Sequence, residues 1–178
     1  MPKRLNIVFF ATVFVLIAFV GICAAQTAKI GVVDYQRVLD SSSAGKTAEA
    51  AVAEEHEKMQ AKLKGMEKEV MELKEKLERE ALVMSKETRE EQEREFRIKV
   101  NDLKTTEKKF VSDLKQKERE LIAKIQEEVN KVVEELGKKE GYLLILERRE
   151  CGAVYFPDSI DLTDKVIDTY NKKAAKGG

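Results

Sequence analysis

The chain has 178 residues, with 33 basic and 33 acidic side chains and no net charge at pH 7. Charged residues make up 37% of it, so opposite signs are interleaved on solvated surfaces, and no polybasic surface for nucleic acid is indicated. Nucleic-acid binding is therefore disfavoured, and salt-sensitive binding would be its test.

Residues 1–25 have the pattern of a secretory signal peptide. Lys3 and Arg4 precede an apolar run over residues 7–22, and small residues follow that run. We expect this segment to be cleaved after export. An uncleaved membrane anchor is the alternative, because the run is close to the shortest length that spans a bilayer. Lipidation of Cys23 is disfavoured, since the residue before it is not small.

The next segment, residues 26–44, is expected to begin a small β-rich body. Residues 29–35 form a short run rich in β-branched side chains and predict a strand. Residues 36–40 are expected to add one helical turn.

Residues 45–136 predict two long antiparallel helices, which we call the arm. Residues 85–91 carry no apolar side chain and begin with Ser85, a good N-cap, so the chain is expected to reverse there. Arms of roughly 40 to 50 residues would extend about 60 to 75 Å at the helical rise per residue. On both sides of the reversal, apolar residues recur at steps of three and four, as on the contact side of a coiled coil: Val52, Met59, Leu63, Met66, Val70, Leu73 and Leu77, then Phe96, Val100, Leu103, Phe110, Leu114, Leu121, Ile125, Val129, Val132 and Leu136.

Three polar residues are expected on that contact side. His56 fills the one gap in the first helix, and Glu107 and Lys117 fall at contact positions of the second. Polar residues at such positions weaken helix pairing while they fix its register. We therefore expect arms that bend and splay.

Residues 137–178 are expected to complete the body. Gly137 predicts the end of the second long helix. Residues 142–147 form an apolar run that predicts a buried strand, and residues 153–156 predict its hairpin partner, for three strands in all. A last helix is expected behind Asp161, with a frayed tail from residue 172.

The resulting fold class is α+β, with a helical hairpin that projects from a body formed by residues 26–44 and 137–178. The body has about 60 residues, too few for a sizeable core, so we expect several chains to associate through it.

No pattern in the chain indicates an enzyme. Residues 45–47 resemble the end of a phosphate-binding loop, but Asp40 occupies the position of that motif's first glycine. The single histidine, His56, and the one cysteine after the signal segment, Cys151, are far apart in the sequence, so neither a metal site nor a nucleophile pair is predicted. We expect no catalytic residue, no cofactor and no metal.

The order of these elements resembles the Skp/OmpH family of periplasmic chaperones. The resemblance covers essentially the whole mature chain. It rests on the strand at 29–35, on Gly45 and Lys46 at the root of the arm, on the acid-rich turn after Ser85, on the strand at 142–146, and on residues 153–155 and 161–167.

The resemblance implies a homotrimer in the periplasm, in which three arms surround a central cavity. It further implies ATP-independent holding of unfolded outer-membrane proteins. The residues implied in oligomerisation are Ile30, Val32, Val33, Leu144, Ile145, Leu146, Val154, Tyr155, Val166, Ile167 and Tyr170. The residues expected to contact a client are Met66, Leu82, Val83, Met84, Phe96 and Ile98.

The sequence departs from the best-known members of that family at the arm tip. Those members are strongly basic, whereas residues 74–104 here contain nine basic and nine acidic side chains. Direct binding to a membrane surface or to lipopolysaccharide is therefore not favoured. A structural coiled-coil adaptor or spacer of the cell envelope is the alternative function.

Overall fold

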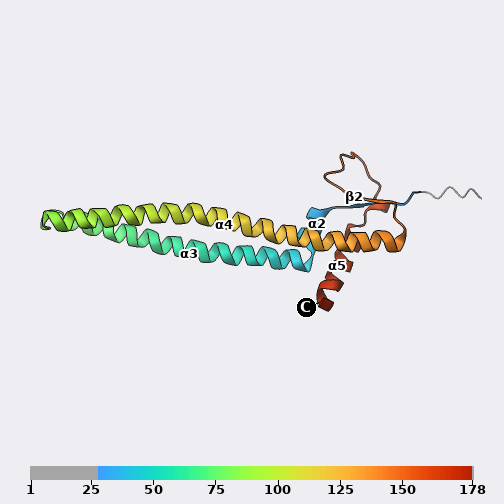
Figure 1. The fold of residues 1–178 in the computed structure, drawn as a ribbon, viewed down its shortest axis with the longest axis horizontal. Helices are drawn as coiled ribbons and strands as arrows, with labels where there is room; N and C mark the ends of the chain where they lie inside the picture. The colour runs from blue at the N-terminus through green and yellow to red at the C-terminus, as the bar shows by residue number, and fades with distance from the viewer. Residues whose placement is uncertain (1–27, 178) are drawn as a thin grey trace, which may run out of the picture.

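The computed structural model describes residues 28–177, so the expected signal peptide lies outside the described residues. The chain forms a long two-helix arm on a small body, which confirms the predicted fold class (Figure 1). Among residues 28–177, none of the helices combines the length and apolar content that crossing a bilayer requires. The elements follow the order β1 (Ile30–Val33), α2 (Tyr35–Ser41), α3 (Ser43–Glu80), α4 (Lys86–Glu140), β2 (Leu144–Glu147), the 3₁₀ turn η1 (Asp158–Ile160) and α5 (Thr163–Gly177).

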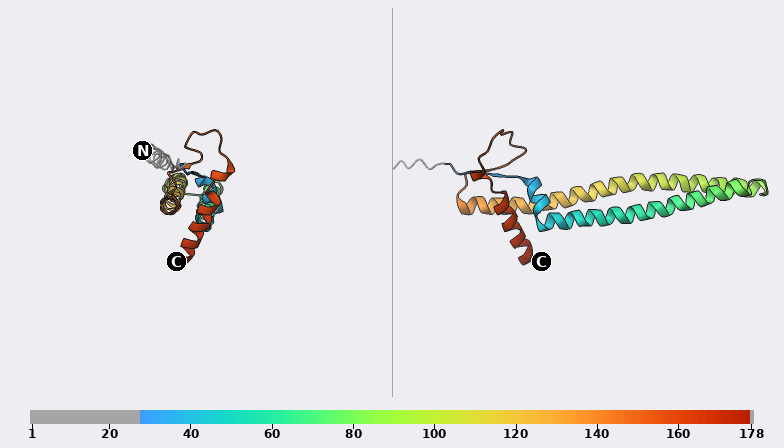
Figure 2. Two further views of the ribbon diagram at one scale, coloured as in Figure 1. Left: turned by 90° about the vertical axis from the view of Figure 1, so that its right-hand side faces the viewer. Right: turned by 180° about the vertical axis from the view of Figure 1, so that it is seen from behind.

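The arm consists of α3 and α4, which lie side by side and antiparallel (Figures 1 and 2). The chain reverses between them, and Ser85 is the N-cap of α4: its hydroxyl accepts the backbone N–H of Thr88 at 3.2 Å. Such a cap satisfies a backbone donor that the first helical turn leaves free. The predicted hairpin and its tip are confirmed.

The contact side of the arm differs from the prediction at its polar positions. The predicted apolar side chains of α3, from Val52 to Leu77, are half-buried. Between Val52 and Met59, however, the half-buried residue is Glu55, and His56 is exposed. On α4, Thr106 is half-buried whereas Glu107 and Lys117 are exposed. A step of seven residues can be divided as three plus four or as four plus three, and the apolar pattern alone does not decide which.

The second arm helix continues into the body for more residues than expected. Gly137 lies inside α4, which ends at Glu140, so the predicted stop at Gly137 is wrong. Gly141 adopts a φ of 71° and ends the helix, and its N–H donates to the carbonyl of Gly137. A glycine takes this left-handed conformation without steric cost, and either glycine could have supplied it.

The core of the body forms where β1, α2 and residues 162–170 pack against the inner end of α4. Each contributes aliphatic side chains from one face, and Tyr170 of α5 closes the cluster. The buried members are Val33, Val38, Ile125, Val129, Val132, Leu136, Leu162, Val166, Ile167 and Tyr170. Four of them, Ile125 to Leu136, come from residues that the sequence analysis assigned to the arm. One helix therefore serves both as half of the arm and as the central element of the body.

The sheet is smaller than expected. Within the described residues it has two strands, β1 and β2, which pair in parallel with Ile30 opposite Leu144 and Val33 opposite Glu147. A single bridge joins Val32 to Asp161 on the other side of β1.

The predicted third strand, residues 153–156, is wrong. This segment pairs with no strand in residues 28–177, and Val154 and Tyr155 are largely exposed. Gly152, at a φ of 70°, does not turn the chain back onto β2, and the loop stands away from the body on the side opposite α5 (Figures 1 and 2).

The predicted last helix is confirmed, but α5 continues to Gly177, so the predicted frayed tail is wrong.

Candidate binding surfaces

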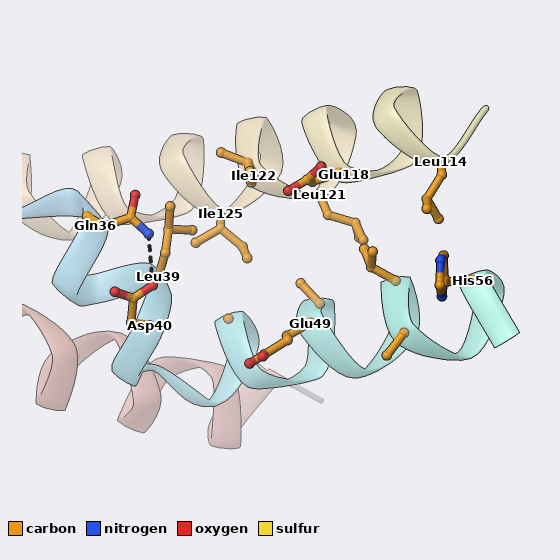
Figure 3. A pocket seen from close by; sticks show the side chains of 14 residues that line it. Gln36, Leu39, Asp40, Glu49, His56, Leu114, Glu118, Leu121, Ile122 and Ile125 are labelled. Atoms are coloured by element: carbon orange, nitrogen blue, oxygen red, sulfur yellow. Dashed lines mark hydrogen bonds between the residues drawn. The ribbon is translucent and has the colours of Figure 1, made fainter. Parts of the chain in front are cut away.

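A cleft of about 600 Å³ opens between α3 and α4 at the root of the arm (Figure 3). Leu39 of α2 borders it near the body, and His56 and Leu114 lie at its far end. Its apolar lining also includes Val52, Leu121, Ile122 and Ile125, together with Ala48 and Ala53. Its volume falls within the range of roughly 300 to 1,000 Å³ found for ligand pockets.

The cleft exists because, at the same level of the arm, α3 carries mostly small side chains and α4 carries no apolar ones. Residues 48–53 of α3 contain four alanines, and residues 115–120 of α4 are all polar. The apolar contact that closes the arm towards its tip is therefore interrupted here. Sequence reasoning identified neither segment as a site, since only their juxtaposition in the hairpin makes the space.

Gly45 fixes how closely α2 and α3 approach beside this cleft. A Cβ atom at position 45 would lie 1.7 Å from the carbonyl oxygen of Leu39. The backbone N–H of Gly45 donates to the hydroxyl of Ser42, the N-cap of α3, at 3.0 Å. The segment that resembles a phosphate-binding loop is thus the first turn of α3, where glycine permits close helix packing.

The residues expected to contact a client fall into two groups. Leu82, Val83 and Ile98 are exposed, and Leu82 and Val83 at the tip have 98% and 84% of their surface accessible. The other three, Met66, Met84 and Phe96, are half-buried in the arm. Leu82 and Val83 are thus free to make apolar contacts with another molecule at the far end of the charged arm.

The residues implied in oligomerisation are also divided. Val32, Val33, Val166, Ile167 and Tyr170 are buried within the single chain. Ile145 and Leu146 are half-buried, and Ile145 packs against the core. The exposed members are Ile30, Leu144, Val154 and Tyr155. Ile30 and Leu144 lie in the sheet, where β2 has β1 as its one neighbouring strand in the described part of the chain, whereas Val154 and Tyr155 lie in the loop after β2.

A network of ion pairs holds the segment after β2 against the body. Arg149 donates to both carboxylate oxygens of Asp34, at 3.2 and 3.3 Å. Asp34 is also the N-cap of α2 and accepts the backbone N–H of Arg37 at 3.0 Å. Arg37 and Arg148 both donate to Asp161. Sequence reasoning missed this network because its members are far apart in the chain.

This network lowers the pKa values of its two central carboxyl groups. Burial disfavours the charged form of Asp34, but the hydrogen bonds from Arg37 and Arg149 outweigh it and place the pKa of Asp34 below its usual value of 3.8. Burial likewise opposes ionisation of Asp161, while Thr163, Arg37 and Arg148 bring the pKa of Asp161 below the same usual value. The folded body therefore favours both carboxylates in their charged form.

A carboxyl group with a lowered folded-state pKa contributes stability that is present above its unfolded pKa and is lost as the pH falls through the folded value. We therefore expect the body to lose stability as the pH drops below 3.8. Asp34→Asn is expected to cost about 1 to 2 kcal/mol at pH 7 and to make the acid-induced loss shallower. Urea unfolding at several pH values measures both effects, with the exposed Asp168→Asn as the control. Parallel pH profiles for Asp34→Asn and the unmodified chain would contradict this role.

No group of three or more His, Cys, Asp or Glu side chains in residues 28–177 is arranged to hold a metal ion. His56 borders the cleft, and its Nε2 lies 3.3 Å from the side-chain nitrogen of Gln60. Cys151 is half-buried in the turn after β2.

Comparison with known proteins identifies the relatives of this chain. A family described as "Outer membrane protein (OmpH-like)" matches residues 29–170, which include the arm and nearly all of the body. The chain belongs to the OmpH-like family. One relative, the Skp-like protein of Pseudomonas aeruginosa, is 32% identical over 166 residues, covering 90% of this chain and 96% of that protein.

The same fold is seen in a solved OmpH-like structure, described as a putative outer membrane chaperone from Caulobacter crescentus. It superposes with a TM-score of 0.77 at 16% identity and covers 86% of this chain and 89% of that one. This match supports the fold. It extends over both arm and body, so the arrangement of an arm on a small body is common to both proteins.

Proposed function

We propose that this chain is an ATP-independent holdase chaperone, which binds unfolded outer-membrane proteins in the periplasm and prevents their aggregation. Membership of the OmpH-like family is the observation that carries the proposal, and a solved structure of the same fold is described as a putative outer membrane chaperone. The arm adds physical support, because it exposes Leu82 and Val83 far from the body. Scattered apolar contacts on a charged surface suit a chain without fixed structure.

Self-association belongs to the same proposal. The outer edge of β2 is unpaired within residues 28–177, and an unpaired strand edge can accept a strand from another chain. Ile30 and Leu144 place exposed apolar surface on this sheet, and Tyr155 adds an exposed aromatic side chain in the loop after β2. We propose that three bodies associate here, so that their arms enclose a cavity for the client, and that residues 1–25 direct export and are removed.

The assembly is tested by Leu144→Asp combined with Tyr155→Asp. Both side chains are exposed in the single chain, so carboxylates there leave the core intact but oppose burial between chains. We expect the trimer to dissociate to monomers of unchanged helicity in analytical ultracentrifugation at micromolar concentration. Met71→Asp on the exposed side of the arm is the control and is expected to retain the trimer. A trimer that persists in the double variant would contradict this interface. Ile145→Asp is a poorer test, because Ile145 also packs inside its own chain.

The holdase activity is tested with a denatured outer-membrane β-barrel protein diluted from urea, without ATP. Stoichiometric mature protein is expected to suppress the light scattering of the aggregating client. The variant with serine at Leu82, Val83 and Ile98 is expected to lose about half of that protection or more, because about 25 cal/mol is lost for each Å² of apolar contact removed. Serine at the exposed polar residues Glu87 and Arg94 is the control, since it leaves net charge unchanged. Normal client precipitation beside the unmodified trimer would reject the holdase and favour the spacer.

A further inference from the structure

We call the cleft between α3 and α4, whose lining residues run from Gln36 to Ile125, the root cleft. The role proposed for it rests on the proposed holdase function and specifies part of that function. We propose that this cleft binds a short apolar segment of an unfolded polypeptide in which a bulky side chain is flanked by lysine or arginine. The cleft is separate from the exposed aliphatic pair at the tip, and it selects by charge as well as by apolar contact.

The apolar character of the occupant follows from the floor of the cleft. Leu121 and Ile125 of α4 point towards α3, and Leu39 of α2 closes the body end (Figure 3). Val52 of α3 also lines the cleft. The alanines at 48 and 53 leave space between these larger side chains. Insertion of one or two leucine or phenylalanine side chains would bury this floor without moving the helices, which α2 and the close contact at Gly45 hold at the root.

The charge of the occupant follows from the rim. Asp40 of α2, Glu49 of α3 and Glu118 of α4 bring carboxylates from three different elements to the border of the cleft (Figure 3). Its lining, as far as the described residues supply it, includes neither lysine nor arginine. This is unlike the rest of the arm, where acidic and basic side chains four residues apart pair repeatedly.

The rim carboxylates also remain available for a ligand. In residues 28–177, Glu49 and Glu118 take part in no ion pair within 4.0 Å, and Asp40 accepts a hydrogen bond from the Gln36 amide at 2.8 Å. An acidic rim around an apolar floor is complementary to an apolar segment with cationic neighbours. A segment flanked by Asp or Glu would be repelled.

A second copy of this chain is a poorer occupant. The loop after β2 has suitable apolar residues, Val154 and Tyr155, and two nearby arginines. Arg148 and Arg149 are already paired with Asp161 and Asp34 of their own body, however. They could neutralise the rim only after those ion pairs break. The client of the proposed function therefore fits the cleft better than another protomer does.

The test uses the full mature trimer and two fluorescein-labelled peptides, Lys-Leu-Phe-Leu-Lys and Glu-Leu-Phe-Leu-Glu. We expect the basic peptide to bind at least about tenfold more tightly by fluorescence anisotropy, which is equivalent to about 1.4 kcal/mol. This preference should shrink as salt is added, because the rim is exposed to solvent. Equal affinities for the two peptides at low salt would overturn the proposal.

Two matched pairs of variants locate the site. Ala53→Phe fills the cleft and is expected to weaken binding of the basic peptide about tenfold, whereas Ala50→Phe, on the same helix but outside the lining, should change it less than about twofold. Glu49→Gln with Glu118→Gln is expected to reduce the preference for the basic peptide to about threefold or less. The exposed Glu107→Gln should preserve the preference. Equal effects of Ala53→Phe and Ala50→Phe would overturn the assignment, as would a charge preference that survives the double glutamine variant.

The same proteins separate this inference from the function on which it rests. Suppression of client aggregation without selective peptide binding would leave the holdase standing and reject the cleft as a site. Selective peptide binding without client protection would support the cleft's chemistry and reject the holdase. A cross-link from a photoreactive residue at position 53 to the loop of another protomer, with no peptide bound, would show that a second copy fills the cleft, and would overturn the proposal.

Discussion

Gly45→Ala is expected to lower the free energy of unfolding of the body by about 3 kcal/mol or more. The added methyl carbon would lie 1.7 Å from the carbonyl oxygen of Leu39 and 2.7 Å from its carbonyl carbon. Both atoms belong to the backbone, so no side-chain rotation relieves the overlap. The corner between α2 and α3 would have to open, which separates Ser42 from the N–H that it caps and disturbs the packing of Val38.

Tyrosine fluorescence measures this effect selectively. The chain has no tryptophan and four tyrosines, Tyr35, Tyr142, Tyr155 and Tyr170, all of which belong to the body. Urea unfolding followed by tyrosine emission therefore reports the body, while circular dichroism reports mainly the arm. Gly65→Ala is the control, because its Cβ meets nothing within 4 Å, and it should stabilise α3 by about 0.5 to 1 kcal/mol. An unchanged tyrosine transition in Gly45→Ala would show that the corner yields easily and that the close approach is unimportant.

Val166→Asp is expected to unfold the body at 25 °C, with a loss of about 4 to 5 kcal/mol. Val166 has 0% of its surface exposed and packs in the cluster formed by β1, α2, α4 and α5. A carboxylate there would have no partner among its aliphatic neighbours, and ionised or neutral it would lose hydrogen bonds to water. We expect the tyrosine signal of an unfolded body while most arm helicity remains.

The control is Val111→Asp, which places the same change on α4 at a side chain that is 53% exposed and should alter stability by less than about 1 kcal/mol.

The experiment also distinguishes a role of Val166 in the core of its own chain from a role in an interface between chains. A core residue destabilises the body at every protein concentration, whereas an interface residue does so less as the concentration rises. A variant with a stable, folded monomeric body would show that Val166 serves assembly and not the core of its own chain.

The arm could be predicted from sequence because its determinants are local. The spacing of Val52, Leu63 and Leu77 defines one helix face, and Ser85 marks the start of the next helix. The same spacing could not decide whether His56 lies on the contact side, because the step of seven from Val52 to Met59 allows either Glu55 or His56 there. The body was predicted less well. Residues 153–156 have the composition of a strand, but a strand also needs a partner, and the described chain offers none.

The candidate sites likewise divide into those that follow from local sequence and those that depend on the complete fold. Leu82 and Val83 were identifiable because they fall outside the repeating apolar pattern, and the structure exposes them. The root cleft could not be found that way. It depends on which residues of α4 lie opposite the alanines of α3, and a hairpin's register is set by the length of its turn and by side-chain packing along the whole arm. The pairing of Asp34 with Arg149 likewise joins segments whose proximity follows from the complete fold.

The parallel pairing of β1 with β2 has a consequence for the order in which the protein folds. Ile30 must find Leu144 across the whole arm, and closure of so long a loop of flexible chain is slow and entropically unfavourable. Contacts within the arm are established progressively from the turn, and each one shortens the distance that remains between the two strands. In the chain, β1 precedes both arm helices and β2 follows them, so β1 stays unpaired until the second arm helix has folded back along the first. The arm is thus the internal scaffold on which the body is assembled, before it takes any part in contact with another molecule.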